Sequence, residues 1–377
     1  MNCGPRPAAA ANLLRTPSTP GPRSRSPRTS GSRSVGWRTR TPSFFASRAA
    51  CCGRCWRAAA HWSSESRTNP RSRRRTGGKR GLDAVEPSRG STAIAVERAC
   101  RAIGLESSDV LSVRPVGGGC INQGTALRTT RGDFFLKWNR EADHRFFRVE
   151  AEGLEALAAT GSVRVPSVIA AGGPGDEVAW LLLEWVEEGR PGTGGWIRLG
   201  RELAALHRGA GPGGPDARFG WSGDNLIGSL PQPNGWSHDW AGFWAERRIR
   251  PLARELRARG ALPAAQAAVV EAVAERADEL LGPAAAADGP SLLHGDLWSG
   301  NVLFARGGAP VLIDPAVYAG HREVDLAMAD LFGGFSGAFR EAYEDTWPLQ
   351  SGHLRRRPAY QLYPLLVHAR LFGGGYA

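Results

Sequence analysis

The sequence lacks several features that would assign it to other classes of protein. It contains no run of about 18 apolar residues, the length that a helix needs to cross a membrane, and no apolar core of a secretory signal near its start. Only two of its six cysteines, Cys100 and Cys120, lie beyond residue 90, too few for a disulfide scaffold. We therefore expect a cytoplasmic protein of a reducing compartment, with no membrane partner.

Acidic residues are scarce in the first 90 residues. This segment holds 19 of the 48 Lys and Arg residues but only three acids, Glu65, Asp83 and Glu86, so it carries a net charge of +16 and the rest of the chain −4. We therefore expect no nucleic-acid partner for the rest of the chain. Residues 1–90 also lack periodic apolar residues and cannot bury enough surface to offset the entropy of ordering, which predicts a disordered basic tail.

Three origins of this tail stay open. It is an organelle transit peptide, a basic arm for nucleic acid or membrane surfaces, or coding sequence joined upstream of the native start. We favour the last, because the tail shows no amphipathic pattern and shares the Ala/Arg/Gly bias of the remainder. Its cysteines Cys51, Cys52 and Cys55 lack the second pair that a zinc site needs, so no metal is expected there.

Order is expected from about residue 91 onward. Residues 91–186 contain a helical stretch, strand patterns on both sides of a glycine turn, a second helical stretch and the apolar run "VAWLLLEWV". Gly- and Pro-rich connectors follow, and long amphipathic stretches then predict helices. The pattern predicts an α+β protein of two lobes, with a small β-rich N-lobe at 91–186, a larger helical C-lobe at 187–377, and a ligand in the cleft between them.

A glycine turn, a strand lysine and a helix glutamate favour phosphate binding in the N-lobe. Lys137 lies in an apolar strand, where its charge needs a partner, and Glu150 lies on the apolar face of the next helix. Protein kinases hold the phosphates of ATP with such a pair. The turn "GGGCIN" matches no standard nucleotide motif and alone would predict a flexible hairpin. Its candidate phosphate-binding residues are Gly117, Gly118, Gly119, Cys120 and Asn122.

The stretch "HGDLWSGNVLF" at 294–304 has the spacing of a kinase catalytic loop. Asp296 precedes Asn301 by five residues, as in H-R-D-L-x-x-x-N. There the aspartate accepts the proton of the attacking hydroxyl, and the asparagine faces a metal on the phosphates. Asp314 follows at the end of an apolar strand, where a carboxylate can chelate Mg²⁺. These residues predict an ATP- and Mg²⁺-dependent kinase, in which His294 braces the loop by hydrogen bonds.

Departures from the protein-kinase motifs predict a small-molecule kinase. Gly295 stands where protein kinases have arginine, "DPA" at 314–316 replaces D-F-G, and no A-P-E segment follows. An activation loop regulated by phosphorylation is therefore not expected.

Four stretches resemble the fructosamine kinases, also called ketosamine 3-kinases. They are "WSGDNLIGSLPQPNG", "DWAGFWAERRIRPL", "LLHGDLWSGNVLF" and "PVLIDPAVYAGHREVDLAMADLFGGF", and the resemblance runs from about Val113 to Tyr376. This family belongs to the wider aminoglycoside-phosphotransferase and choline-kinase-like group, with a protein-kinase-like fold. The resemblance implies ATP-dependent phosphorylation of the C3 hydroxyl of a ketosamine, small or protein-bound, and a role in protein deglycation and repair.

The resemblance also implies roles for single residues. Asp296 matches the family's catalytic base, and Asn301 and Asp314 match its Mg²⁺ ligands. Glu184 and Val186 would offer backbone groups to adenine from a hinge strand. We expect Asp325 to brace the catalytic loop. The sugar-site candidates share polar groups or flat rings, and they are Asp224, Asn225, Gln232, Asn234 and Trp298, with Trp240 and Phe243 as further rings.

Several alternatives stay open. Backbone N–H groups around Cys120 would lower the pKa of its thiol, and the resemblance implies a redox-linked homodimer, with an inert loop thiol as the simpler alternative. A monomer and a homodimer both stay open. Members of the family usually continue the last helix past Ala377, so that helix is expected to lack its final turns. The other functions considered are a phosphotransferase for an aminoglycoside or amino alcohol, and a non-catalytic binding protein with a kinase fold. The complete set of residues in catalytic order argues against the last.

Overall fold

The computed structural model describes residues 89–117, 121–209 and 218–373 of the 377-residue chain. The predicted tail up to residue 88 lies outside the described residues, as do Gly118, Gly119 and Cys120 of the predicted phosphate-binding turn. None of the described helices is long and apolar enough to cross a membrane.

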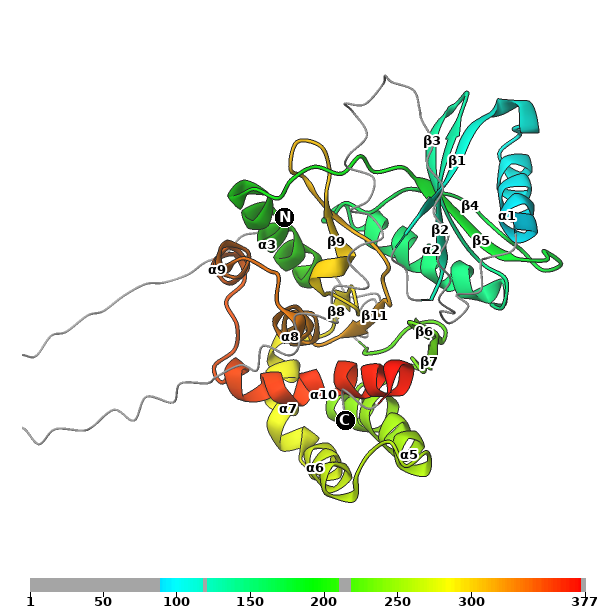
Figure 1. Ribbon diagram of the computed structural model, residues 1–377. Coiled ribbons are helices and arrows are strands. Elements are labelled where there is room, and N and C mark those ends of the chain that lie inside the picture. The colour runs from blue at the N-terminus through cyan, green and yellow to red at the C-terminus, as the bar shows by residue number, and fades with distance from the viewer. Residues whose placement is uncertain (1–88, 118–120, 210–217, 374–377) are drawn as a thin grey trace, which may run out of the picture. The chain divides into compact units, whose positions relative to one another are not determined.

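A five-stranded antiparallel sheet forms the first part of the described chain (Figure 1). Its strands lie in the order β1-β2-β3-β5-β4, and all neighbouring strands run antiparallel. Two helices accompany the sheet, α1 (Arg89–Ala102) and α2 (Arg145–Ala159). The strands are β1 (Val110–Val116), β2 (Gln123–Thr129), β3 (Gly132–Asn139), β4 (Val168–Ala171) and β5 (Ala179–Glu184).

Helices on both faces of the sheet explain the continuous apolar run of β5. Leu181 and Leu183 belong to a buried cluster that includes Leu154 of α2. Trp180 and Leu182 belong to a second cluster that includes residues of α1. Because successive strand residues point to opposite faces, a strand that is buried on both faces needs an apolar residue at every position.

The second part of the described chain is mainly helical, and two short strand pairs frame the predicted catalytic loop. β8 (Ser291–Leu293) pairs with β11 (Tyr318–Gly320), and β9 (Val302–Phe304) pairs with β10 (Pro310–Leu312). A third pair joins β6 (Asn225–Ile227) to β7 (Leu230–Gln232). The helices are α3 (Thr193–Arg208), α4 (Trp240–Trp244), α5 (Arg250–Ala258), α6 (Ala264–Glu275), α7 (Ala277–Asp288), α8 (Glu323–Phe332), α9 (Gly337–Thr346) and α10 (His353–Phe372).

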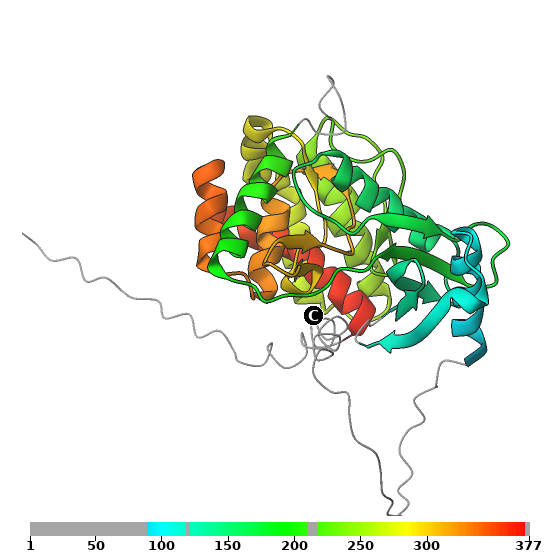
Figure 2. The same cartoon turned by 90° about the horizontal axis from the view of Figure 1, so that it is seen from above.

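The sheet and the helices form two groups of elements. Seen from above, the strands of the sheet and α1 gather at one end, whereas α8 and α9 lie toward the other (Figure 2). β5 ends at Glu184 and α3 begins at Thr193, so the predicted lobe boundary after residue 186 falls in the connection between the groups. The predicted α+β class, with a β-rich part followed by a helical part, is confirmed.

Candidate active site

The predicted catalytic loop begins with a turn that requires glycine. Gly295 follows His294 directly after β8 and has a φ of +81°, in the left-handed region that other residues rarely adopt. A Cβ added to Gly295 would stand 2.0 Å from the carbonyl oxygen of Ala316. This close approach explains why glycine replaces the arginine of protein kinases, because the loop packs directly against the segment that follows Asp314.

His294 holds the loop from the interior. It is fully buried, its Nε2 lies 2.9 Å from the carbonyl oxygen of Ile313, and its Nδ1 accepts a hydrogen bond of 3.3 Å from the backbone N–H of Asp296. Burial lowers the pKa of His294, so the ring is neutral at pH 7. Since Nδ1 is an acceptor, the proton is on Nε2 and is donated to Ile313. Both nitrogens are thus engaged in holding the loop.

Asp325, in the first turn of α8, holds the backbone on the N-terminal side of Asp296. Its carboxylate accepts hydrogen bonds from the backbone N–H of His294 at 2.7 Å and of Gly295 at 2.9 Å. Burial would raise the pKa of Asp325, but the hydrogen bonds that it accepts from His207 and from the backbone N–H of Gly295 outweigh burial and lower it. Asp325 therefore stays ionised while fully buried.

His207 is a member of this support that sequence reasoning missed. It lies in the last turn of α3 and is buried, with its Nε2 3.2 Å from the carboxylate of Asp325 and its Nδ1 2.8 Å from the hydroxyl of Tyr343. The available signal was a histidine on the apolar face of an amphipathic helix, in "ELAALH". That position predicts a core residue as readily as a functional one.

Asn301 fixes the carboxylate of Asp296. The amide Nδ2 of Asn301 donates to the backbone carbonyl of Asp296 at 2.8 Å and to its carboxylate at 3.0 Å. Asp296 is half-buried. Loss of solvent around it, opposed by the Asn301 hydrogen bond and assisted by the charges of Asp314 and Asp325, raises the pKa of Asp296 to about 7. The site thus holds a carboxylate with an unusually high affinity for a proton.

Lys137 connects the sheet to the predicted catalytic segment. Its ammonium lies 2.6 Å from the carboxylate of Glu150 on α2 and 3.0 Å from that of Asp314. Lys137 and Glu150 are buried, whereas the side chain of Asp314 is 47% exposed. Burial alone would lower the pKa of Lys137, but the charges of Asp314 and Glu150 raise it well above its ordinary value. Lys137 therefore stays charged although it is buried.

Asn301 and Asp314 present oxygen atoms of the kind that Mg²⁺ prefers. Because the amide nitrogen of Asn301 faces Asp296, the amide oxygen is left for a cation. Asp314 has a φ of +55°, and it is the one residue other than glycine with a positive φ among those described. No group of three or more His, Cys, Asp or Glu side chains placed to hold a metal occurs in the described chain. Mg²⁺ needs no such group when nucleotide phosphates complete its shell, so the donors fit this ion.

The predicted turn and hinge residues keep few free groups. The side chain of Asn139 on β3 donates to the amide oxygen of Asn122 at 3.0 Å, so Asn122 ties the turn to the sheet. Gly117, on the other side of the turn, is exposed. The backbone N–H of Glu184 donates to Ser167 at 2.9 Å, so this N–H is not available to a ligand. The side chain of Val186 is buried, so Val186 would contact adenine only through its backbone.

Three predicted sugar-site residues lie in the interior. The side chains of Asn225, Gln232 and Asn234 are buried and hydrogen-bonded to one another and to backbone carbonyls. Their polar groups are thus engaged within the protein, and this placement does not support direct contact with a sugar. Trp240 and Phe243 are also buried, in the aromatic core beneath.

Asp224 and Trp298 are the predicted sugar-site residues that reach the surface. Asp224 is exposed and Trp298 half-buried. The indole of Trp298 packs edge-on against Phe332, with 6.3 Å between ring centroids. It also covers Gly300, where a Cβ would stand 2.2 Å from the ring. The glycine that follows Trp-Ser is therefore required by the position of this indole, two residues after Asp296.

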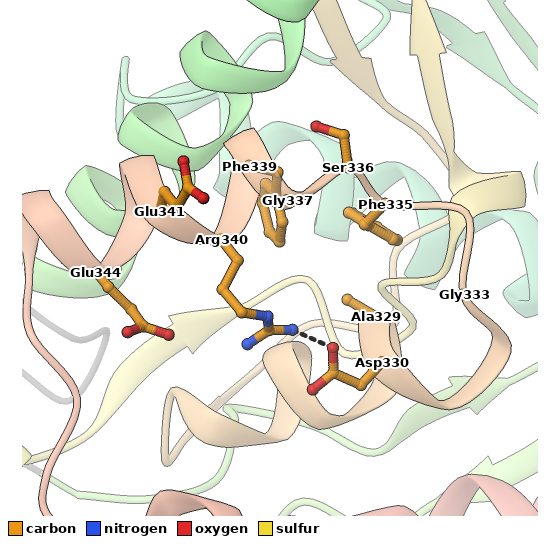
Figure 3. A pocket seen from close by; sticks show the side chains of 10 residues that line it. All are labelled: Ala329, Asp330, Gly333, Phe335, Ser336, Gly337, Phe339, Arg340, Glu341 and Glu344. Carbon is orange, nitrogen blue, oxygen red and sulfur yellow. Dashed lines mark hydrogen bonds and ion pairs between the residues drawn. The ribbon is translucent and has the colours of Figure 1, made fainter. Parts of the chain in front are cut away.

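A separate hollow lies at the connection between α8 and α9 (Figure 3). It has a volume of about 340 Å³, and Asp330 of α8 forms an ion pair across it with Arg340 of α9. None of the predicted site residues that the structure describes lines this hollow. In the same connection Gly334 approaches the catalytic loop, since a Cβ there would stand 2.5 Å from the hydroxyl of Ser299. The hollow is therefore a neighbour of the predicted site and no part of it.

Fold and site together define a kinase-like phosphotransferase. A family model described as fructosamine kinase matches residues 95–377. The chain belongs to the fructosamine kinase family, and as a member it is an ATP-dependent phosphotransferase.

Individual relatives agree with this membership. A Synechocystis protein assigned as a ketoamine kinase is 46% identical over 264 residues, which cover 70% of this chain and 85% of that protein. The chloroplastic protein-ribulosamine 3-kinase of Arabidopsis thaliana is 37% identical over 274 residues, which cover 72% of this chain and 81% of that protein.

Solved structures extend the likeness to the fold. The crystal structure of a Thermobifida fusca protein assigned as a fructosamine-3-kinase superposes with a TM-score of 0.63 at 38% identity, and covers 71% of this chain and 90% of that chain. The corresponding Haemophilus somnus protein gives a TM-score of 0.65 at 28% identity, with 73% and 89% covered. The predicted two-lobed, protein-kinase-like fold is confirmed.

Proposed function

We propose that this chain transfers the γ-phosphate of ATP to the C3 hydroxyl of a ketosamine, the adduct that forms when glucose or ribose glycates an amine. Family membership supports this activity, as do relatives named for ketoamine and ribulosamine kinases. The observation that carries the proposal is a set of two hydrogen-bonded pairs, Lys137 with Asp314 and Asn301 with Asp296. A backbone hydrogen bond of 3.0 Å from Ile313 to Asn301 joins the segments of the two pairs. Because a 3-phosphate makes the adduct labile, the biological role would be deglycation, a form of protein repair.

Asp296 is the proposed base. Its carboxylate is held by Asn301, and its pKa of about 7 suits a group that must accept a proton near neutral pH. In this role Asp296 orients the C3 hydroxyl and takes its proton as the oxygen attacks phosphorus. His294 and Asp325 act on the backbone around Asp296, and they keep the carboxylate in place when the substrate is absent.

Lys137 and Glu150 are the proposed anchors of the α- and β-phosphates. Glu150 keeps the Lys137 ammonium fixed at 2.6 Å, so little reorganisation is needed when phosphate oxygens arrive. Asn301 and Asp314 would hold Mg²⁺, which when bound neutralises charge on the β- and γ-phosphates. Gly117 and Asn122 border the proposed phosphate-binding turn.

The adenine ring is proposed to lie against the hinge after β5. There the carbonyl of Glu184 and the backbone N–H of Val186 offer one acceptor and one donor. Asp224 and Trp298 are the proposed contacts for the sugar, because both reach the surface. Monomer or homodimer, a redox link through Cys120 and a cytoplasmic location stay predictions of the sequence.

A coupled ADP-release assay tests the proposal. The chain would be supplied with Mg²⁺, ATP and, in turn, fructoselysine, ribuloselysine, an aminoglycoside and choline. We expect turnover with at least one of the two ketosamines and none with the other acceptors. Turnover with the aminoglycoside or choline alone would show that the substrate is an aminoglycoside or amino alcohol and not a ketosamine. No turnover with any acceptor would favour a binding protein with a kinase fold.

A further inference from the structure

A chain of buried polar side chains runs from Arg248 to the segment that follows Asp314. Arg248 is fully buried, in the π-helical turn Ala245–Ile249 between α4 and α5. Its guanidinium forms no ion pair with a carboxylate in the described part of the chain. It donates instead to the carbonyl of Pro233 and to the amide oxygen of Asn234, both at 2.6 Å. Such a buried cation needs other compensation.

Aromatic rings supply that compensation. The guanidinium carbon of Arg248 lies 4.2 Å from the ring centroid of Tyr318, 4.7 Å from that of Phe243 and 5.5 Å from that of Tyr363. The faces of aromatic rings attract cations, most strongly where water is absent. These rings and hydrogen bonds thus hold the Arg248 guanidinium in place, and no carboxylate of the described residues forms an ion pair with it.

The direction of the hydrogen bonds follows from the arginine. Because a guanidinium only donates, the Asn234 amide must turn its oxygen toward Arg248 and its nitrogen away. That nitrogen donates to Asn225 at 2.7 Å, and the Asn225 nitrogen donates to the carbonyl of Val317 at 2.8 Å. The series of amides from Asn234 to Asn225 therefore ends on the Val317 carbonyl, in the segment after Asp314, while the Asn234 nitrogen also donates to the carbonyl of Gly223 at 3.4 Å.

Gln232 adds a second contact to the same segment. Its amide nitrogen donates to Asn225 at 2.9 Å and to the carbonyl of Ala316 at 3.2 Å, while its oxygen accepts from the hydroxyl of Tyr363 at 2.8 Å. The Ala316 carbonyl is also the group that packs against Gly295 of the catalytic loop. Gln232 thus fixes one backbone group that lies in the segment after Asp314, the predicted Mg²⁺ ligand, and touches the loop of Asp296, the predicted base.

We propose that Arg248, Asn234, Asn225 and Gln232 are positioning residues for phosphoryl transfer, and that they act by holding the carbonyls of Ala316 and Val317. The need arises from the backbone of Asp314, whose φ of +55° is unfavourable for a residue with a side chain and persists only where its surroundings enforce it. Strand pairing fixes the chain before Asp314, and the amides fix the chain after it. This inference rests on the proposed function, in which Asp314 holds Mg²⁺.

Gln232→Met and Gln361→Met form the matched pair that tests the inference. Both substitutions remove an amide that donates to a backbone carbonyl, but Gln361 donates at 3.0 Å to Ala327 within α8 and does not contact the segment after Asp314. Binding of AMP-PNP would be measured by calorimetry with and without Mg²⁺, and kcat and KM by the ADP-release assay, at temperatures where thermal unfolding shows each variant folded.

We expect Gln232→Met to reduce the gain in AMP-PNP affinity that Mg²⁺ provides, and kcat, by about 10–100-fold each, the effect typical of groups that orient a metal ligand. AMP-PNP affinity without Mg²⁺ should be unchanged, and Gln361→Met should match the wild type. Equal values for a folded Gln232→Met and the wild type would overturn the inference.

Asn225→Asp supplies a second variant if Gln232→Met does not fold. It replaces the amide nitrogen that reaches Val317 by a carboxylate oxygen, which cannot donate, and keeps the oxygen that accepts from Gln232 and Asn234. We expect the same selective loss of the Mg²⁺-dependent gain, and a wild-type gain would contradict the inference. If the wild type itself shows no Mg²⁺-dependent binding of AMP-PNP, the proposed function fails, and the inference fails with it.

Discussion

Two clusters of buried charge differ in how completely their carboxylates are used. In the closed cluster, Asp288 at the end of α7 accepts hydrogen bonds from His321, Arg322 and Gln350, and its side chain is 1% exposed. In the open cluster, Lys137 and Glu150 are buried but the side chain of Asp314 is 47% exposed.

The difference concerns what each cluster can still bind. Arg322 of the closed cluster also donates to the carbonyls of Trp347 and Pro348 and lies 3.7 Å from the Trp347 ring centroid, so its donors face protein groups on several sides. In the open cluster Lys137 is the partner that holds Asp314, which leaves carboxylate oxygen for a ligand. Burial of charge therefore does not by itself mark a site. A binding site is indicated instead by a carboxylate that lies beside a buried cation and still has an oxygen exposed to a ligand.

The largest expected effect is at Asp296, beside the open cluster. Asp296→Asn keeps the size of the side chain and an oxygen for Asn301, but it removes the group proposed to accept the proton. We expect kcat to fall by about 10²–10⁴-fold, with the affinity for ATP retained. The ADP-release assay and nucleotide titration measure both. Glu341→Gln, at an exposed position of α9, is the control, and near-normal turnover by Asp296→Asn would show that the base is elsewhere.

The second effect falls on stability and distinguishes the two clusters. Asp288→Ala leaves Arg322 buried without its carboxylate, and we expect the free energy of unfolding to fall by about 3–5 kcal/mol. Asp314→Ala should cost much less stability, because Lys137 keeps Glu150 at 2.6 Å, yet it should lower kcat, because Asp314 is a proposed Mg²⁺ ligand. Urea unfolding at pH 7, with kcat measured per folded molecule, compares the pair. Equal stability losses would remove the distinction between closed and open clusters.

Acid should reveal the closed cluster in the wild type. Burial would raise the pKa of Asp288, but the hydrogen bonds of His321, Arg322 and Gln350 and the charge of Arg322 lower it well below its ordinary range. A lowered folded-state pKa gives stability that is complete above the unfolded value, about 3.9, and that declines as the pH falls below it. We expect urea unfolding from pH 6 to pH 3 to show a smaller decline for Asp288→Asn than for the wild type, and parallel curves would contradict this assignment.

Much of the site was predictable because its spacing is a property of the chain. Lys137, Glu150, Asp296, Asn301 and Asp314 follow a known order, and the structure brings them into direct or neighbouring contact. Spacing does not report burial, however. The polar cluster in "DNLIGSLPQPN" was predicted to face a sugar, whereas its amides lie in the interior.

The features that the sequence did not reveal are contacts between residues that are distant in sequence. The Gln232 amide meets Ala316, 84 positions away, and His207 meets Asp325 over 118 positions. No local pattern records such pairs. Gly295 illustrates the same limit. The sequence shows that glycine replaces the arginine of the kinase motif, but it does not show the reason, which is the close approach of the Ala316 carbonyl.

The smallest predicted effect is that of Arg164→Ala, which distinguishes the role of the Glu184 carboxylate from that of the Glu184 backbone. Arg164 pairs with the Glu184 carboxylate at 2.7 Å, with both side chains about one-third or more exposed. Solvent screens such pairs, so Arg164→Ala should lower the free energy of unfolding by only about 0.2–1 kcal/mol, and by less at high salt. The hydroxyl and N–H of Ser167 still hold the carboxylate.

The same variant also tests the hinge assignment. Because adenine is proposed to meet the Glu184 carbonyl, Arg164→Ala should leave the KM for ATP unchanged. Glu184→Gln, which removes the charge and keeps the carbonyl, should do the same. A large rise in KM for both variants would show that the carboxylate itself takes part in nucleotide binding. A rise in the KM for ATP with Arg164→Ala alone would show that the Arg164 guanidinium, and not the Glu184 carboxylate, contacts the nucleotide.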